Sequence, residues 1–244
     1  MLILPSVSLL FFILCGSGDT ELTGPTDTAQ YVSGRLDPVT HPLFIRIDTL
    51  GIPCDRPQYL RKEAALALRD MHNAFVSAHP GMRFVVRSST RTFSDQTAIW
   101  TRKWNELCEK NPAMNDRDRA SDILRYSSMP GTSRHHWGTD FDLNELVNGY
   151  YDKGEGLVLY KWLCENAMQY GFVQPYTAGR TSGYREERWH WSYRPLSSRL
   201  VKRWNELFEK YPEKLFGKKE FPGSHLAGEL APVYVNAVNH DCLD

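Results

Sequence analysis

The stretch "SRHHWGTDFDL", residues 133–143, holds two adjacent histidines, a glycine and two aspartates. Its second half alternates polar and apolar residues, which is typical of a strand. Side chains in a strand point alternately to its two faces, so Asp140 and Asp142 are expected on the same face. His135 precedes this strand across a turn that contains Gly138. We therefore expect a loop followed by a strand, which brings His135 and Asp142 to one point.

An imidazole nitrogen and a carboxylate oxygen together suit Zn²⁺. A third ligand must come from elsewhere, and "ERWHWSY" at 187–193 offers His190, with Glu187 three residues before it. Three protein ligands with one open position are typical of catalytic zinc, which lowers the pKa of bound water from about 15.7 to roughly 7. The sequence thus predicts a catalytic zinc site, with Glu187 nearby as a general acid/base rather than as a ligand.

Helical and strand patterns around these stretches do not alternate regularly. Asp55 and Pro57 indicate a helix start, and apolar residues then recur at three- and four-residue steps as far as Phe75. Further helices are expected at 94–110, 116–126, 156–170 and 197–210, and further strands at 83–90, 171–175 and 187–193. These patterns predict an α+β fold, with helices packed on a small, mainly antiparallel sheet that carries the zinc site.

Composition sets limits on partners. The 244 residues are 41% hydrophobic and 24% charged, which is ordinary for one globular domain. Lys and Arg number 29, as do Asp and Glu, so the formal net charge is zero. The protein therefore has no net positive charge that would attract nucleic acid or anionic lipid. We therefore expect no nucleic-acid partner, and we expect a monomer.

The N-terminus has a composition of its own. Residues 2–15, "LILPSVSLLFFILC", are uncharged and largely apolar, and small residues follow them. The run is short for a transmembrane helix. It predicts a signal peptide or lipoprotein signal at 1–18, with Cys15 as a candidate lipid attachment point that would anchor the protein to a membrane. An exported protein of the bacterial periplasm or cell envelope is expected.

The rest of the chain divides into three parts by composition. Residues 19–50 are expected to form an irregular leader, 51–215 the domain with the zinc site, and 216–244 an extended tail. Four cysteines remain after the signal segment, and none forms a CxxC pair, which disfavours a cysteine-based metal site. One or two disulfides and buried free thiols are both compatible with this number.

Four sequence elements, in the same order, resemble the zinc D-alanyl-D-alanine carboxypeptidases and dipeptidases, the group that includes vancomycin-resistance enzymes. Residues 133–142 are similar to its S-x-H-x-x-G-x-A-x-D signature, and 187–190 to its E-P-W-H segment. "SSTRTFSDQ" at 88–96 resembles S-G-Y-R-S-x-x-x-Q, and "YGF" at 170–172 resembles a stretch found between the two metal motifs. The domain at 51–215 would then be a zinc carboxypeptidase domain.

The resemblance implies roles for individual residues. His135, Asp142 and His190 would bind zinc, Glu187 would be the general acid/base, and Arg91 would stabilise the developing oxyanion. A guanidinium suits that task because the tetrahedral intermediate carries an additional negative charge. Gln96 and Ser133 would bind substrate, and Arg87 and Arg180 are further candidates for the terminal carboxylate of a peptide.

Three departures from the family pattern bear on the site. Asp140 replaces a small alanine; it either accepts a hydrogen bond from an imidazole N–H in the outer shell, our preferred interpretation, or competes as a ligand. Ser89 and Thr90 replace Gly-Tyr, and Arg188 replaces the proline. His136 is an alternative ligand to its neighbour, but the motif register selects His135.

The implied activity is zinc-dependent hydrolysis of the C-terminal peptide bond of peptidoglycan stem peptides, as a D-alanyl-D-alanine carboxypeptidase. The same centre would also suit an L,D-carboxypeptidase or a peptidoglycan endopeptidase. A third alternative is a binding module that keeps zinc without catalysis. The presence of both Glu187 and Arg91 argues against it, because zinc binding alone needs neither.

Overall fold

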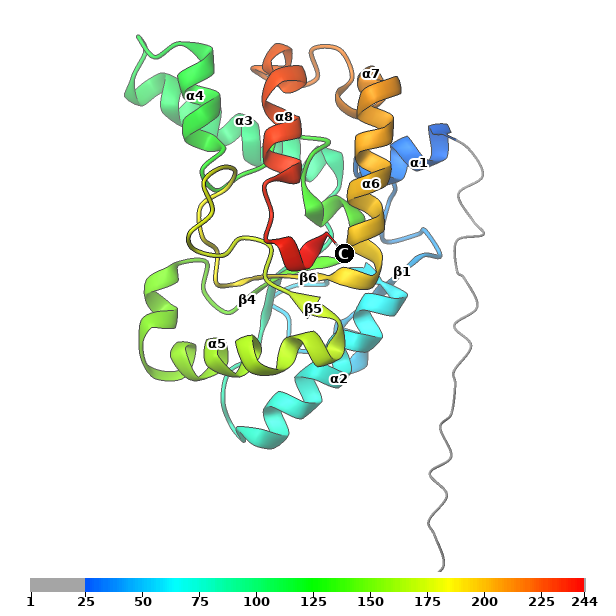
Figure 1. The fold of residues 1–244 in the computed structure, drawn as a ribbon, viewed down its shortest axis with the longest axis vertical. Helices are drawn as coiled ribbons and strands as arrows, with labels where there is room; N and C mark the ends of the chain where they lie inside the picture. Colours follow the sequence, from blue (N-terminus) through cyan, green and yellow to red (C-terminus); the bar gives the residue numbers. More distant parts are fainter. Residues whose placement is uncertain (1–24, 244) are drawn as a thin grey trace, which may run out of the picture.

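The structure is a computed structural model that describes residues 25–243 (Figure 1), so the expected signal segment and Cys15 lie outside the described residues. None of the helices within 25–243 has the length and apolar character needed to cross a membrane. The described part of the chain forms eight α-helices: α1 Pro25–Val32, α2 Lys62–Ala78, α3 Phe93–Lys110, α4 Asp116–Ile123, α5 Gly154–Asn166, α6 Arg194–Lys210, α7 Pro212–Phe216 and α8 Ala227–Asn236. Its six strands are β1 Phe44–Arg46, β2 Tyr59–Arg61, β3 Val86–Ser88, β4 Asp140–Leu143, β5 Phe172–Val173 and β6 His190–Tyr193.

A four-stranded sheet lies at the centre, in the order β3-β4-β6-β5, and all its strand pairs are antiparallel. In the β4–β6 pair, Asp140 lies opposite Ser192 and Asp142 opposite His190. Strands β1 and β2 form a separate antiparallel pair. The predicted α+β fold with a small antiparallel sheet is therefore confirmed.

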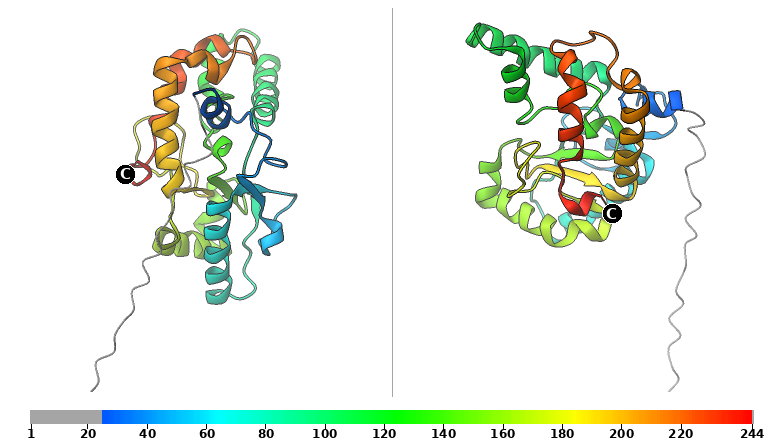
Figure 2. Two further views of the ribbon diagram at one scale, coloured as in Figure 1. Left: turned by 90° about the vertical axis from the view of Figure 1, so that its right-hand side faces the viewer. Right: turned by 45° about the horizontal axis from the view of Figure 1, so that its top comes forward.

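Helices cover both faces of this sheet. α2 and α5 lie on one side, while α3, α4, α6, α7 and α8 gather on the other, and the rotated views agree (Figures 1 and 2). Phe141, Leu143 and Trp191 belong to the apolar core on the α2 and α5 side. Side chains alternate along a strand, so Asp140 and Asp142 face the other helical layer. All four residues of β4 are buried.

The leader at 19–50 is not irregular throughout. Residues 25–32 form α1, and residues 44–46 form β1. Tyr31 and Val32 are buried in the core of the larger helical layer, and the Tyr31 hydroxyl donates to the Trp137 carbonyl oxygen at 2.7 Å. This segment is part of the domain because its apolar side chains have core partners far along the chain.

The first long helix begins later than its sequence signals suggest. Asp55 and Pro57 indicated the start, whereas α2 begins at Lys62. Residues 59–61 instead pair with β1, a long-range contact that local helix signals do not reveal. The expected strand at 187–193 is likewise shorter and begins at His190, because Glu187 to Trp189 form a turn in which the His190 amide donates to the Glu187 carbonyl oxygen.

The C-terminal tail was expected to be extended, but it is largely helical. Residues 227–236 form α8, with Ala227, Ala231 and Val235 buried at four-residue steps. That spacing is a helical stripe, although a short one. After α8 the chain returns towards the sheet (red in Figure 1), where the Asn239 amide donates to the Pro175 carbonyl oxygen at 2.8 Å.

The four cysteines within the described residues are free thiols: Cys54, Cys108, Cys164 and Cys242. Cys242 is fully buried, and burial raises the pKa of its thiol to about 11. Of the two interpretations left open by the sequence, the structure fits unpaired thiols.

Candidate metal centre

The three predicted ligands come together from three separate elements. His135 lies on a short 3₁₀ helix, Arg134–Trp137, Asp142 on β4, and His190 on the neighbouring β6. One side-chain donor atom of each lies within 4.8 Å of those of the other two. His135 Nε2 is 3.4 Å from Asp142 Oδ2, and His190 Nδ1 is 3.1 Å from Asp142 Oδ1. All three residues are buried.

Gly138 provides the turn that returns the chain from His135 into β4. Its φ of 68° lies in the left-handed region, which favours glycine. A Cβ at this position would lie 2.5 Å from the Phe44 ring and 3.1 Å from the Arg61 amide nitrogen. The glycine is therefore required both by its backbone conformation and by the close approach of Phe44.

Hydrogen bonds fix which imidazole nitrogen faces the centre. His135 Nδ1 is 2.7 Å from the Ser89 carbonyl oxygen, which can only accept, so Nδ1 carries the proton and Nε2 holds the lone pair. Burial lowers the pKa of His135 to about 4, so the ring is neutral at pH 7. His190 Nε2 is 2.9 Å from Asp140 Oδ2, which leaves Nδ1 directed towards Asp142. Both rings thus present the nitrogen needed for metal binding.

His135 Nε2 is buried without a hydrogen-bond partner, and Asp142 Oδ1 has only His190 Nδ1 nearby, at 3.1 Å. Leaving a buried donor nitrogen unpaired is costly, and a cation bound between the two residues would satisfy both atoms. Burial alone would lower the pKa of His190, but hydrogen bonds to Asp140 and Asp142 raise it to about 9. The pair of carboxylates therefore attracts positive charge, which a divalent cation would supply by displacing the Nδ1 proton.

Asp140 fits the orienting role rather than that of a ligand, because both its oxygens are already engaged. Oδ2 accepts from His190 Nε2 and from Arg134 Nε, each at 2.9 Å. Oδ1 accepts from the Thr139 and Ser192 hydroxyls at 2.6 and 2.8 Å. Burial by itself would raise the pKa of Asp140, but the Arg134 guanidinium and His190 hold it below its usual range. The carboxylate is thus ionised and holds His190 in one orientation.

His136 does not face the centre. Its Nδ1 is 2.7 Å from the Arg91 carbonyl oxygen, and its Nε2 accepts from the Gly131 amide at 3.1 Å. Both ring nitrogens of His136 therefore form hydrogen bonds with the backbone, at Arg91 and at Gly131. The geometry assigns His135, and not His136, to the ligand cluster.

Glu187 lies beside the three donors. Its Oε2 is 3.5 Å from His190 Nδ1, and its side chain is 8% exposed. Burial raises the pKa of this carboxyl to about 8. A carboxyl that exchanges its proton near neutral pH, at the edge of a metal site, suits general acid/base chemistry.

A cleft of about 270 Å³, including open solvent at its mouth, leads to the centre. Its walls comprise Arg91, Tyr126, Ser127, Ser128, Ser133, His135, Tyr176, Tyr184, Glu187 and His190. Arg91 Nε and Ser133 Oγ are buried without hydrogen-bond partners, so both can bind a ligand. The structure thus places Arg91, Ser133 and Glu187 around the same opening.

Gln96, predicted to contact the substrate, does not line this cleft. Its side chain is fully buried, and its Nε2 donates to the Ser128 carbonyl oxygen at 2.7 Å, behind the cleft wall. The two arginines suggested for a peptide carboxylate are also engaged elsewhere. Arg87 pairs with Asp55 at 2.7 Å, and the Arg180 guanidinium donates to backbone carbonyls, among them that of Ala237 at 2.6 Å.

Sequence reasoning missed several residues in and behind the cleft wall, among them Tyr176 and Lys103. The Tyr176 ring lies 4.8 Å from that of His190 and forms part of the wall. Lys103 lies behind Ser127 and donates to its hydroxyl at 2.6 Å. Lys103 follows Gln96 by seven residues, so both lie on one face of α3; that spacing was the available signal. No comparable pattern precedes Tyr176.

A sequence model of the family described as VanY, D-alanyl-D-alanine carboxypeptidase, matches residues 57–196, more than half of the chain. The protein therefore belongs to this family. It is 29% identical over 128 residues to a D-alanyl-D-alanine carboxypeptidase of Enterococcus faecalis (strain ATCC 700802 / V583), covering 52% of this chain and 45% of the relative. It is 27% identical over 164 residues to a D-alanyl-D-alanine carboxypeptidase of Enterococcus faecium, covering 66% and 46%. The chain thus spans about half the length of these curated relatives.

Two solved structures are similar at low identity. One is a mutant of the vancomycin resistance D,D-pentapeptidase VanY in complex with Zn(II), with a TM-score of 0.47 and 24% identity over 63% of this chain and 82% of that one. The other is the LdcB LD-carboxypeptidase, with a TM-score of 0.49 and 23% identity over 72% and 79%.

Proposed function

We propose that this protein is a zinc-dependent carboxypeptidase that removes the C-terminal residue from peptidoglycan stem peptides. The observation that carries the proposal is the convergence of His135 Nε2, Asp142 and His190 Nδ1 beside Glu187. Two nitrogens, one carboxylate and an adjacent free carboxyl are the groups that a catalytic zinc site uses. A D-alanyl-D-alanine bond is the first candidate substrate, in line with the family.

The residues of the chain divide the chemistry among them. His135, Asp142 and His190 would hold Zn²⁺, which would supply Lewis acidity at neutral pH. Glu187 accepts the proton of the attacking water and returns it to the leaving amine. The Arg91 guanidinium stabilises the negative charge that develops on the carbonyl oxygen. The Ser133 hydroxyl, which has no partner, is placed to bind the peptide.

We further propose that the protein acts outside the bacterial cytoplasm, in the periplasm or cell envelope, as a monomer. The apolar stretch at 2–15 supports export, by a cleaved signal or by lipid attachment at Cys15. Stem peptides of peptidoglycan lie in that compartment, so location and substrate agree.

The decisive experiment incubates the purified, zinc-loaded protein with a stem pentapeptide that ends in D-Ala-D-Ala and measures released D-alanine. We expect release that a chelator abolishes and added zinc restores. Release that persists after complete chelation would remove the zinc mechanism. Cleavage of the tetrapeptide alone would instead indicate an L,D-carboxypeptidase, and cleavage at an internal bond an endopeptidase.

A matched variant tests the acid/base role. Glu187→Gln keeps the size of the side chain but cannot accept a proton, so we expect kcat to fall by about 10²–10⁴-fold. Zinc affinity, measured by competition with a chromogenic chelator, is expected to stay close to that of the wild type. An unchanged rate would favour a different base, and zinc binding without any hydrolysis by the wild type would favour the binding module.

A further inference from the structure

Lys103 is a half-buried cation without a counter-ion. It lies on α3, and its ammonium donates to the Ser127 hydroxyl at 2.6 Å. Among residues 25–243, no carboxylate lies within ion-pair distance of it. Its neighbour Arg102 is different: that side chain is 60% exposed and pairs with Glu106 at 2.6 Å.

Burying a charge without a partner is unfavourable, and an anion bound in the cleft would offset this cost for the Lys103 ammonium. Desolvation lowers the pKa of the Lys103 ammonium, and Arg102 and Arg91 lower it further, while Glu187 raises it. Arg91 and Glu187 both line the cleft. The Lys103 ammonium itself lies directly behind the cleft wall, 2.6 Å from the Ser127 hydroxyl.

Ser127 connects this charge to the cleft. Its side chain lines the wall, and its oxygen accepts the hydrogen bond from Lys103. The serine hydroxyl therefore has its own proton free to donate into the cleft. Arg91 Nε and Ser133 Oγ, both without partners, lie in the same walls. Donors and positive charge thus dominate this part of the cleft.

Resting on the peptidase function proposed above, we propose that Lys103 and Ser127 form a subsite for a carboxylate group of the peptide substrate. Ser127 donates the hydrogen bond, and Lys103 orients that hydroxyl and supplies the charge, as a positioning residue. The carboxylate has two sources: the free C-terminus of the peptide, or the side chain of an acidic residue within it.

The test compares Lys103→Met with Arg102→Met, which removes a charge from the same helix away from the cleft. Three stem peptides are used: the free acid, its C-terminal amide, and a free acid whose acidic side chains are converted to amides. With the free acid, Lys103→Met is expected to raise KM by about tenfold or more, as for the loss of a hydrogen bond to a charged group. Arg102→Met is expected to match the wild type.

The peptide series identifies the source. If the C-terminal amide abolishes the difference between Lys103→Met and wild type, the subsite binds the terminal carboxylate. If only the side-chain amides abolish it, the subsite binds an acidic side chain. The proposal is overturned if Lys103→Met has the KM of the wild type for every peptide, or raises KM equally for charged and neutral peptides, as a merely structural role would.

Two further measurements distinguish a failure of the carboxylate subsite from a failure of the proposed peptidase function. Ser127→Ala removes the donor and is expected to give the same dependence on peptide charge, which provides the test if Lys103→Met does not fold. Calorimetric binding of the three peptides to zinc-loaded Glu187→Gln protein, with and without Lys103→Met, tests recognition without turnover. Equal binding in both proteins, or none, overturns the subsite, whereas a wild type without zinc-dependent hydrolysis overturns the function.

Discussion

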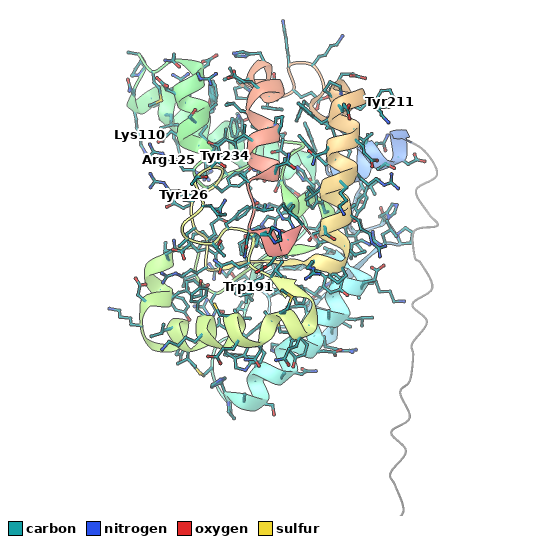
Figure 3. All side chains as sticks on the ribbon, in the orientation of Figure 1. Lys110, Arg125, Tyr126, Trp191, Tyr211 and Tyr234 are labelled. Carbon is teal, nitrogen blue, oxygen red and sulfur yellow. The ribbon has the colours of Figure 1, made fainter. Side chains whose placement is uncertain are left out.

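The two faces of the β4–β6 pair are both buried, yet they differ in chemistry. Phe141, Leu143 and Trp191 pack into the core formed with α2 and α5, and Trp191 lies on that side of the sheet in Figure 3. Asp142 and His190, from the same two strands, lie on the opposite face, where they converge with His135 at the metal centre. Tyr126, on the cleft side, appears well above the sheet in the same view.

This difference shows that burial by itself does not distinguish structure from function. On the apolar face, burial is favourable because water is excluded from hydrocarbon. On the polar face, burial leaves His135 Nε2 without a partner beside the Asp142 carboxylate, which is costly unless a cation binds. Substitutions on the two faces are therefore expected to affect different properties, and the following experiments compare them.

The largest effect is expected for Asp142→Ala on the polar face. It removes the one carboxylate that contacts both histidines, so zinc affinity is expected to fall by at least about 100-fold and hydrolysis to become undetectable. A chelator competition assay measures the affinity, and circular dichroism checks that the variant is folded. Near-normal zinc affinity would remove Asp142 from the ligand set.

Phe141→Ala, one residue earlier, tests the apolar face. Phe141 is fully buried, so its truncation is expected to reduce the free energy of unfolding by about 3–5 kcal/mol. Denaturant titration of the metal-free protein measures this loss. The zinc affinity of the folded variant is expected to stay within a few fold of the wild type. An affinity as low as that of Asp142→Ala would contradict the separation of the two faces.

Asp140→Asn tests the layer behind the ligands. The amide keeps the size of the side chain but weakens the hold on His190 Nε2, so zinc affinity is expected to fall by about 10–100-fold. Thr139→Val is the matched control, because Thr139 donates to the other oxygen of the same carboxylate and does not touch His190. A loss in the control as large as that in Asp140→Asn would indicate a general packing role.

The smallest effect concerns pH and an imidazole near the apolar core. His72 lies 5.2 Å from the Phe84 ring, and burial lowers the pKa of His72. The unfolded chain therefore binds the proton more readily, so the stability that the neutral ring allows is fully present above about pH 6.5 and decreases as pH falls below it. His72→Gln is expected to lose this part of the pH dependence, measured by unfolding between pH 7 and 5. The exposed His225→Gln is the control, and an equal change in both would contradict the role of burial.

Local patterns in the sequence were sufficient for much of the fold, and together with the family resemblance they selected the three residues that the structure brings together. The alternation in 138–144 predicted a strand with Asp140 and Asp142 on one face, and in β4 both carboxylates contact His190. The C-terminal end of α3 at Lys110 also agrees with the helix expected at 94–110. These features depend on side-chain periodicity and on helix-end chemistry, which are local properties.

Features that depend on distant partners were not predictable in the same way. α1 is buried against residues more than a hundred positions away, such as Trp137, and β2 forms only because β1 lies beside it. Gln96, expected to contact the substrate, donates through Nε2 to the Ser128 carbonyl oxygen and has no partner for Oε1, an arrangement that only the fold reveals. The charge of Lys103 became interpretable only when its neighbours in space were known.

The register of β4 against β6 makes assembly of the centre all-or-none. Asp142 lies opposite His190, and alternate side chains point to opposite faces. A slip of one residue in β6 would turn His190 towards the apolar core that contains Phe141, and Trp191 towards the metal centre. The chain would then lose a metal donor and a core residue together. Binding of the ion would therefore stabilise only chains in which β4 and β6 pair in the native register, because chains in another register could not bind it.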